Sequence, residues 1–468
     1  MKKTICLVMS LFMVISLMAG CGGNPSGADA DDSAAARKDA SEKDAELSED
    51  ADALKSGEMA AGVVSGDEAF ANAQELSGEI TVWSWDVEMW KKVIVPAFNE
   101  VYPNITVNLV NVPSDELKVK LLAALASGSG APDVATVQGD DIVQYVENGG
   151  LLDLTDRMAP VKDGFPAYKI ANNSDSKGRI YGVPMDAGPV GMFYRTDLFE
   201  KAGIETPPVT WEEWLEAGEK LAAKGMYLHR ATSTGDPEFV RMVLQQQGGS
   251  LFDEEGNPTI DTPEMRRTLE LQTKLVTSGV GVDAASWTPD YNELMTGDQL
   301  ATHIGGAWYM NTMMYSWADT PKTWKIAPMP YFEGTAPASA NNGGAELVIP
   351  EQSEKQDLAW AFVNFRCATV AGRVAITEDM GEFGCYMPAY EGTELMDATI
   401  DYYGDQKVFQ FFAGQTELVP TNFRITPAFT EVLNMVGTNS GPIITGEVPL
   451  EEGIAKMQEL AEAIVAKY

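Results

Sequence analysis

Three short segments rich in β-branched residues set the architecture of this 468-residue chain: EITVW at residues 79–83, ITVNLV at 105–110 and DVATV at 133–137. Helical sequence lies between them, at about 88–101 and at 115–126. Pro96 falls inside the first helical stretch and should kink or restart that helix, because proline lacks the N–H that the helix ladder needs. Strands that alternate with helices predict a mainly parallel, doubly wound α/β sheet.

The carboxyl ends of these strands are where we expect a ligand site, because open α/β sheets bind ligands in the crevice along that edge. The first strand leads into Trp85 and Asp86, and the third leads into Asp140. We take these three residues as candidate ligand contacts. Alternation along a strand places Trp83 on the same side as Trp85. The alternative to a ligand role is that Trp83 packs in the core while Trp85 is exposed. For Asp140 the alternative is a turn or a helix cap.

The N-terminus has the features of an export signal over residues 1–20. Two lysines precede an apolar run from Ile5 to Leu17, which is too short to span a bilayer comfortably. The run ends in Met18-Ala19-Gly20-Cys21, which resembles a bacterial lipoprotein cleavage site with lipidation of Cys21. An ordinary signal peptide with an incidental cysteine is the alternative. We expect the protein on the extracytoplasmic face of a bacterial cell membrane, attached through this lipid anchor only.

The segment 21–77 is rich in Ala, Asp, Ser, Glu and Gly and has almost no aromatic residues. Such a segment cannot bury enough apolar surface to offset the conformational entropy lost on folding. We therefore expect an acidic, disordered linker between the lipidated cysteine and the folded body.

Charge and cysteine content exclude several classes of partner. The chain has 33 basic and 69 acidic residues, a net charge of −36, which repels nucleic acid and anionic lipid. The body holds two cysteines, Cys367 and Cys385, which either form a disulfide or remain buried thiols. With only two histidines and no Cys-x-x-Cys pair, the sequence predicts no metal and no cofactor.

Sequence patterns predict two helices in the second half of the chain. Thr210 and Glu213 have the spacing of a capping box at a helix start. Trp211 and Trp214 recur at helical spacing with other apolar residues, so we expect both in the core. Apolar residues on one face of 450–465 predict a packed terminal helix.

Three groups of segments, taken in order, carry a resemblance to a known family. They are GRIYGVP (178–184) with MFYR (192–195) and PPVTW (207–211), MTGDQLA (295–301) with GGAW (305–308), and NGG (342–344) with LVI (347–349) and AWAF (359–362). The chain from about Gly78 to Tyr468 resembles the extracellular solute-binding proteins of family 1, the maltose-binding-protein-like group.

The resemblance implies an α/β, two-lobed periplasmic-binding-protein-like fold of type II, with a hinge between two doubly wound lobes. Lobe 1 would comprise 78–185 with 342–388, and lobe 2 would comprise 188–338 with 389–468. The chain would cross between the lobes near 184–188, 339–343 and 386–390. Glycine and proline cluster at the first two crossings, as a hinge or a tight passage allows.

The resemblance also implies a function: capture of a carbohydrate, in particular an oligosaccharide, by hinge closure and delivery to the permease subunits of an ABC importer. The protein would act as a monomer and would not be an enzyme. Sugar recognition needs flat apolar rings for the C–H faces and planar polar groups for the hydroxyls. The candidate ligand residues are Trp85, Asp86, Asp140, Asp186, Trp287, Trp308, Asn342, Glu346, Arg424 and Phe429.

Two other functions stay open at this point. The first is binding of a non-sugar solute, such as a polyol or a phosphodiester. The second is a secreted glycoside hydrolase, which needs two carboxyl groups about 5–9 Å apart. Adjacent residues such as Asp140 and Asp141 would diverge on an extended segment, and no other pair stands out. A core position for Trp308 and a simple ion pair for Arg424 are the structural alternatives at those residues.

Overall fold

The computed structural model describes residues 70, 71, 73–85, 87–318 and 323–468. The export signal, Cys21, most of the linker and Asp86 lie outside the described residues, so the predictions about them stay predictions. Among the described helices, none is both long enough and apolar enough to cross a bilayer.

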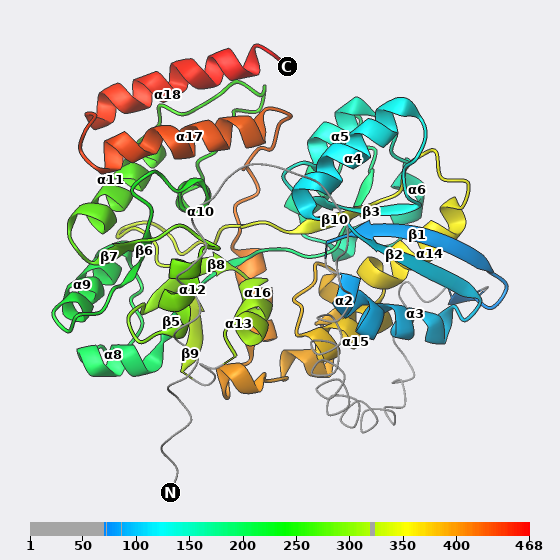
Figure 1. Ribbon diagram of the computed structural model, residues 1–468, viewed down its shortest axis with the longest axis horizontal. Helices are drawn as coiled ribbons and strands as arrows, with labels where there is room; N and C mark the ends of the chain where they lie inside the picture. Colours follow the sequence, from blue (N-terminus) through cyan, green and yellow to red (C-terminus); the bar gives the residue numbers. More distant parts are fainter. Residues whose placement is uncertain (1–69, 72, 86, 319–322) are drawn as a thin grey trace, which may run out of the picture. The chain divides into compact units, whose positions relative to one another are not determined.

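Five strands form the first sheet in the order β2-β1-β3-β10-β4 (Figure 1). Their bounds are β1 Gly78–Ser84, β2 Ile105–Asn111, β3 Val134–Gln138, β4 Gly182–Pro184 and β10 Ala345–Val348. β1 pairs in parallel with β2 and with β3, which confirms the three strands expected from residues 79–137. β10 arrives from much later in the chain and lies antiparallel between β3 and β4.

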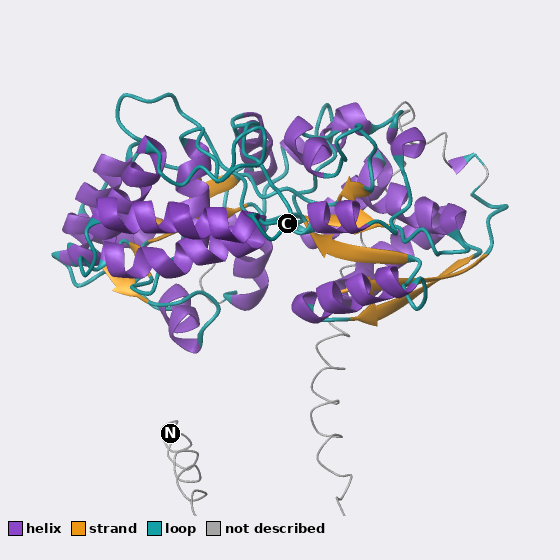
Figure 2. Ribbon diagram, turned by 90° about the horizontal axis from the view of Figure 1, so that it is seen from above, coloured by secondary structure: helices purple, strands orange, loops and turns teal. Residues whose placement is uncertain are grey.

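The helices of the first lobe, defined here as the first sheet and the helices that follow its strands, cover both faces of the sheet (Figure 2). They are α2 Val87–Met89, α3 Val95–Val101, α4 Ser114–Ser127, α5 Ile142–Asn148, α6 Thr155–Met158, α7 Ala167–Asn172, α14 Gln356–Ala368 and α15 Val370–Met380. Pro96 lies in the first turn of α3, directly after the π-helical turn Trp90–Ile94, so the expected restart is confirmed.

A continuous apolar core lies beneath α3 and α14. The ring of Phe98 stacks on Tyr102 with centroids 4.8 Å apart and meets Phe362 edge-on at 5.3 Å. Cys367 and Cys385 are both buried and both free, so the structure has two thiols rather than a disulfide.

The second sheet has the order β8-β5-β9 and is antiparallel throughout. Its strands are β5 Val190–Arg195, β8 Thr302–Gly306 and β9 Trp324–Pro328; a separate parallel pair consists of β6 His229–Ala231 and β7 Gly281–Asp283. The expectation of mainly parallel pairing therefore holds for β1 to β3 and for β6 with β7, and not for the second sheet. A run of apolar residues indicates a strand, but it does not show whether the neighbouring strands pair with it in parallel or antiparallel.

The second lobe, defined here as these strands with the remaining helices, has several tryptophans in its core. Its helices are α8 Thr196–Ala202, α9 Trp211–Ala222, α10 Pro237–Gln246, α11 Pro263–Thr277, α12 Pro289–Thr296, α13 Tyr309–Ser316, α16 Val408–Glu417, α17 Phe429–Ile444 and α18 Leu450–Val465. Thr210 and Glu213 form the capping box of α9. Trp211 and Trp214 are fully buried, as expected, and α18 packs against α17 through its apolar face.

Segments that connect the two sheets lie side by side. One runs from β4 to β5 and another from β9 to β10; Pro189 on the first pairs with Asn341 on the second. The N–H of Asn342 donates to the carbonyl of Gly188 at 2.8 Å. A Cβ at Gly188 would lie 1.8 Å from the carbonyl oxygen of Asn342, so this approach requires glycine. Asp186, on the first of these connections, also forms an isolated β-bridge with Gly384. A third segment therefore lies next to the two connections.

Candidate ligand-binding site

The edge of the first sheet at the end of β3 contacts the second lobe directly. The carboxylate of Asp140 forms an ion pair with the guanidinium of Arg241 on α10. Gln144 on α5 donates to the carbonyl of Pro427 at 2.9 Å. We call these contacts, together with the hydrogen bond from Thr430 to Asp141 at 3.1 Å, the seam. The structure thus places Asp140 at a contact between the end of β3 and α10, and its role as a ligand contact stays a prediction.

Arg241 is the central residue of the seam and is missing from the set of predicted residues. Its side chain is only 4% exposed, and its guanidinium lies over the rings of Phe429 at 5.3 Å and Phe423 at 5.8 Å. The structure therefore brings Phe429 and Asp140 to the same cation. One signal could have identified Arg241: it is the only charged residue in the apolar stretch FVRMVL (239–244) of α10.

A buried ion pair lies behind the seam, at the start of β10. Lys169 donates to Glu346 at 2.5 Å, and both side chains are at most 2% exposed. Burial raises the pKa of Glu346 to about 7 against the opposing effect of Lys169. Glu346 is therefore placed in the interior with Lys169 as its partner, and it does not face solvent. A Cβ at Gly139 would lie 2.9 Å from its carboxylate, so the chain passes very close to this pair.

Asp186 lies beside the same pair, in the segment that leaves β4. Its carboxylate accepts a hydrogen bond from the N–H of Ala345 at 2.7 Å. Burial, together with the nearby Glu382, raises the pKa of Asp186. Asp186 thus ties the first connection between the sheets to the start of β10.

Trp308 and Asn342 are in direct contact. The indole N–H of Trp308 donates to the carbonyl of Asn342 at 2.8 Å, which joins the end of β8 to the second connection between the sheets. The side-chain nitrogen of Asn342 is buried and has no hydrogen-bond partner among the described residues. Trp308 itself is only partly buried, so its ring is neither wholly in the core nor fully exposed. The ring packs over Gly306 and Gly343, where a Cβ would come within 2.8 and 3.2 Å of the indole nitrogen.

Three aromatic rings meet at this point. Trp287 lies nearly parallel to Tyr309 (5.5 Å, 11°) and to Trp308 (5.9 Å, 24°), and Trp308 lies 4.0 Å from Tyr309. Trp287 is 52% exposed and adopts φ 64°, a left-handed backbone conformation. We call Trp287, Trp308 and Tyr309 the aromatic face. Tyr309 was not predicted, although it directly follows the predicted Trp308 in the sequence.

The remaining predicted residues stand apart from these clusters. Trp85 is partly buried and packs against the core of the first lobe, on the same side of β1 as Trp83. Arg424 is exposed, and its backbone N–H donates to Ser250 at 3.0 Å. Its guanidinium forms no ion pair within the part of the chain that the structure describes. The described residues also contain no group of three or more His, Cys, Asp or Glu side chains placed to hold a metal ion.

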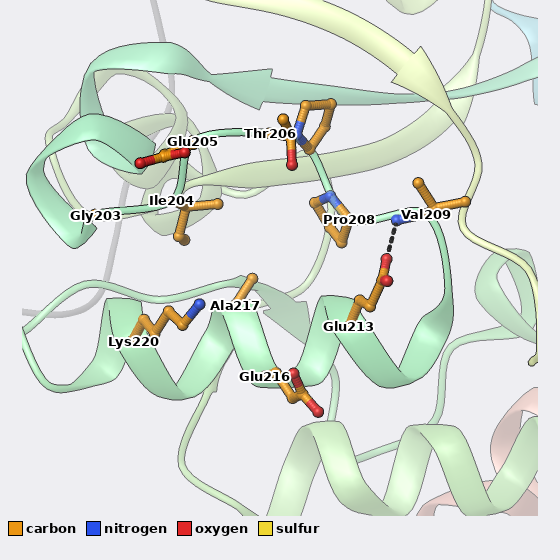
Figure 3. A pocket seen from close by; sticks show the side chains of 11 residues that line it. Gly203, Ile204, Glu205, Thr206, Pro208, Val209, Glu213, Glu216, Ala217 and Lys220 are labelled. Carbon is orange, nitrogen blue, oxygen red and sulfur yellow. Dashed lines mark hydrogen bonds between the residues drawn. The ribbon is translucent and has the colours of Figure 1, made fainter.

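A different pocket, of about 400 Å³, lies on the surface of the second lobe between residues 203–209 and α9 (Figure 3). Glu213 lines it and accepts a hydrogen bond from the N–H of Val209 at 2.8 Å. None of the predicted ligand residues lines this pocket, and it has no aromatic side chain. Its position separates it from the aromatic face and from the seam.

Comparisons with known proteins identify the family and the fold. The family model described as bacterial extracellular solute-binding protein matches residues 84–365. A lactose-binding protein of Rhizobium radiobacter is 28% identical over 400 residues, which cover 82% of this chain and 92% of that protein.

Solved structures are similar over the same range. The binding protein of Bifidobacterium animalis subsp. lactis Bl-04, in complex with β-1,6-galactobiose, superposes with TM-score 0.68 at 26% identity and covers 82% of this chain and 97% of that one. The sugar-binding protein MalE of Xanthomonas citri has the same fold, with TM-score 0.71 at 19% identity over 83% of this chain and 98% of that one.

The fold is therefore the mixed α/β fold of type II periplasmic binding proteins, with helices on both faces of the first sheet. The family match spans more than half of the chain and includes the end of β1, the seam residue Asp140 and all three rings of the aromatic face. This chain belongs to the bacterial extracellular solute-binding proteins.

Proposed function

We propose that this protein is the extracytoplasmic binding protein of an ABC importer and that its ligand is a carbohydrate. Relatives of similar length support the solute class, because they include a lactose-binding protein and a protein in complex with β-1,6-galactobiose. The observation in this chain that carries the proposal is the aromatic face. Trp287 is 52% exposed and Trp308 is partly buried, so these two rings can provide the flat apolar surface that the C–H side of a pyranose requires, while the fully buried Tyr309 supports them.

Polar groups at the seam and next to Trp308 would bind the sugar hydroxyls. Asp140 and Arg241 are oriented at the seam, and the amide nitrogen of Asn342 is a donor without a partner among the described residues. Planar, preoriented groups of this kind bind neighbouring hydroxyls in pairs. Lys169 and Glu346 would act only through packing, since they lie behind the site and neutralise each other.

Binding would proceed by closure of two lobes, 78–185 with 342–388 and 188–338 with 389–468. The close approach of Gly188 to Asn342 marks the hinge in this proposal, since the chain passes between the sheets there. The closed monomer would then dock on the permease subunits and release the sugar to them. Size-exclusion chromatography with light scattering tests whether the protein is a monomer in solution.

Titration of the purified protein with mono- and oligosaccharides, followed by calorimetry, tests the carbohydrate as ligand. We expect Trp308→Ala to weaken binding of the best sugar by about 10- to 100-fold, the amount that loss of a stacking ring costs. Trp360→Ala is the matched control, because Trp360 is half-buried on α14 beneath Arg157. Unchanged affinity in Trp308→Ala, with only a lower melting temperature, would assign Trp308 to the core.

Two competing functions are tested with the same protein. Polyols and phosphodiesters in the titration panel test a non-sugar solute. Incubation with the bound oligosaccharide, followed by analysis for reducing ends, tests hydrolysis; we expect the ligand to be recovered intact. New reducing ends above those of a protein-free sample would show an enzyme.

We also propose that Cys21 carries the lipid that holds the protein on the outer face of the cell membrane. The sequence Met18-Ala19-Gly20-Cys21 supports this anchor, and two or more acyl chains suffice for stable attachment. Cys21→Ala should move the protein from the membrane fraction to the soluble fraction or the medium. Retention of this variant in the membrane would argue against the anchor.

A further inference from the structure

A second pocket, of about 350 Å³, opens directly beside the aromatic face. Trp287, Asn292, Glu293, Thr296, Ser316 and Trp317 line it. Its volume falls within the range of small-molecule sites, about 300–1,000 Å³. Helix α12 provides three of these side chains, so most of the polar wall belongs to one regular element.

Trp287 joins this pocket to the aromatic face. Its ring stacks on Trp308 and Tyr309 and at the same time lines the pocket. Its backbone is held at φ 64°, which a bulky residue adopts only when the surrounding structure imposes it. Since such conformations concentrate at functional sites, the exposed ring is a feature that requires an explanation beyond packing.

The polar side of the pocket suits an uncharged, hydroxyl-rich group. The indole N–H of Trp317 donates to the side-chain oxygen of Asn292 at 3.3 Å, which leaves the amide NH₂ of Asn292 to act as a donor. The exposed carboxylate of Glu293 forms no ion pair within the described residues and can accept hydroxyl protons. No Lys or Arg lines the pocket, so an anionic group would find no counter-charge.

The pocket of Figure 3 provides a useful contrast. It is somewhat larger, at about 400 Å³, but its walls carry Glu205, Glu213, Glu216 and Lys220 and no aromatic ring. None of the three rings of the aromatic face lines it, so volume alone does not make it a sugar site. Of these two pockets, the one beside Trp287 combines an exposed ring, a donor and an acceptor.

We propose that the pocket beside Trp287 is an additional subsite that binds the outer unit of an oligosaccharide whose inner unit lies against Trp308. The ligand class is thereby narrowed to uncharged oligosaccharides long enough to extend across Trp287. This inference rests on the proposed function, because it assumes that the aromatic face binds a sugar.

The test measures affinity against chain length by calorimetry. The probes are malto-, arabino- and β-galacto-oligosaccharides of two to five units, and the series that binds is used for the variants. Affinity should rise by about tenfold between the shortest member that binds and a member one or two units longer, as expected for one added ring contact. Trp287→Gly removes the ring and accommodates φ 64°, and it should lower the affinity of the longer members more than that of the shortest, so that the rise disappears. Asn292→Ala should abolish part of the rise.

Two further variants separate the possible outcomes. Tyr468→Ala removes an exposed aromatic residue at the C-terminus and should behave as wild type at every length. Trp308→Ala should weaken all lengths. If the affinity of Trp287→Gly still rises with chain length as that of the wild type does, the additional subsite is wrong although the sugar function stands. If the wild type binds no member of any series, the proposed function fails, and the subsite fails with it.

Discussion

Trp287 is the only non-glycine residue with a positive φ in the described part of the chain. Holding a bulky side chain in the left-handed region costs about 1–3 kcal/mol, which the surrounding structure must supply. Here the ring contacts with Tyr309 and Trp308 offset part of that cost. The position of the Trp287 ring is therefore maintained at a cost in folding free energy.

The strain at Trp287 leads to a prediction about two variants that both lack the ring. Trp287→Gly should be more stable than Trp287→Ala by about 1 kcal/mol, because glycine adopts positive φ without a steric penalty. Urea unfolding measures the difference. At Trp360, inside α14, the order should reverse, with Ala more stable than Gly by about 1 kcal/mol. Equal stability of the two Trp287 variants would show that its backbone is not strained.

Helices α14 and α15 share a buried charge cluster. Glu382, just beyond α15, accepts from Arg366 at 2.7 Å and from Arg373 at 3.0 Å, and both arginines are fully buried. Burial by itself raises the pKa of Glu382, but the two arginines outweigh it and lower the pKa to about 2. The cluster fixes the end of α15 against α14, next to the segment that contacts Asp186.

The lowered pKa of Glu382 predicts a pH dependence at the level of these helices. A carboxyl group that titrates near 4.5 when unfolded and near 2 when folded contributes stability above pH 4.5, which is lost as the pH falls towards 2. This contribution is of the order of 3 kcal/mol. The stability gap between wild type and Glu382→Gln, from urea unfolding, should therefore narrow by about this amount between pH 5 and pH 2.

Glu447→Gln is the control for this pH series, since Glu447 is exposed in the loop before α18. Its stability should follow that of the wild type at every pH. A gap between wild type and Glu382→Gln that does not change with pH would mean that Glu382 titrates alike in the folded and unfolded chains.

At the scale of the whole molecule, the seam joins the two lobes through a small number of polar contacts. Asp140 and Asp141 follow β3, and Gln144 lies on α5. Their partners lie on α10, in the loop before α17 and in the first turn of α17. The guanidinium of Arg241 lies over the rings of Phe423 and Phe429, and its side chain is nearly fully buried. Loss of its carboxylate partner would leave a buried charge without compensation.

Asp140→Asn should therefore loosen the seam. We expect the radius of gyration of the ligand-free protein, measured by small-angle X-ray scattering, to increase and the affinity for sugar to fall about tenfold or more. Glu116→Gln removes an exposed ion pair with Lys120 and should change neither quantity, since such pairs contribute at most about 1 kcal/mol. An unchanged radius of gyration in Asp140→Asn would show that this pair does not hold the lobes together.

The sequence by itself predicted what depends on neighbouring residues. The β1, β2 and β3 strands, the restart at Pro96, the capping box of Thr210 and the apolar face of α18 follow from backbone chemistry within a few residues. Family membership also came from local segments in order. Asp140 became a candidate ligand contact because it follows a strand and open α/β sheets bind ligands at the carboxyl ends of their strands.

Only the tertiary structure decided which distant residues meet. The antiparallel entry of β10 and the pairing of Lys169 with Glu346 join segments far apart in the chain, and the stacking of Tyr309 on Trp287 joins α13 to the loop before α12. Glu346 shows what the sequence could not predict. Its position in the chain suggested a ligand contact, but in the folded protein it is buried and paired with Lys169. Local patterns carry no information on such contacts, because burial and electrostatic pairing depend on how the complete chain packs.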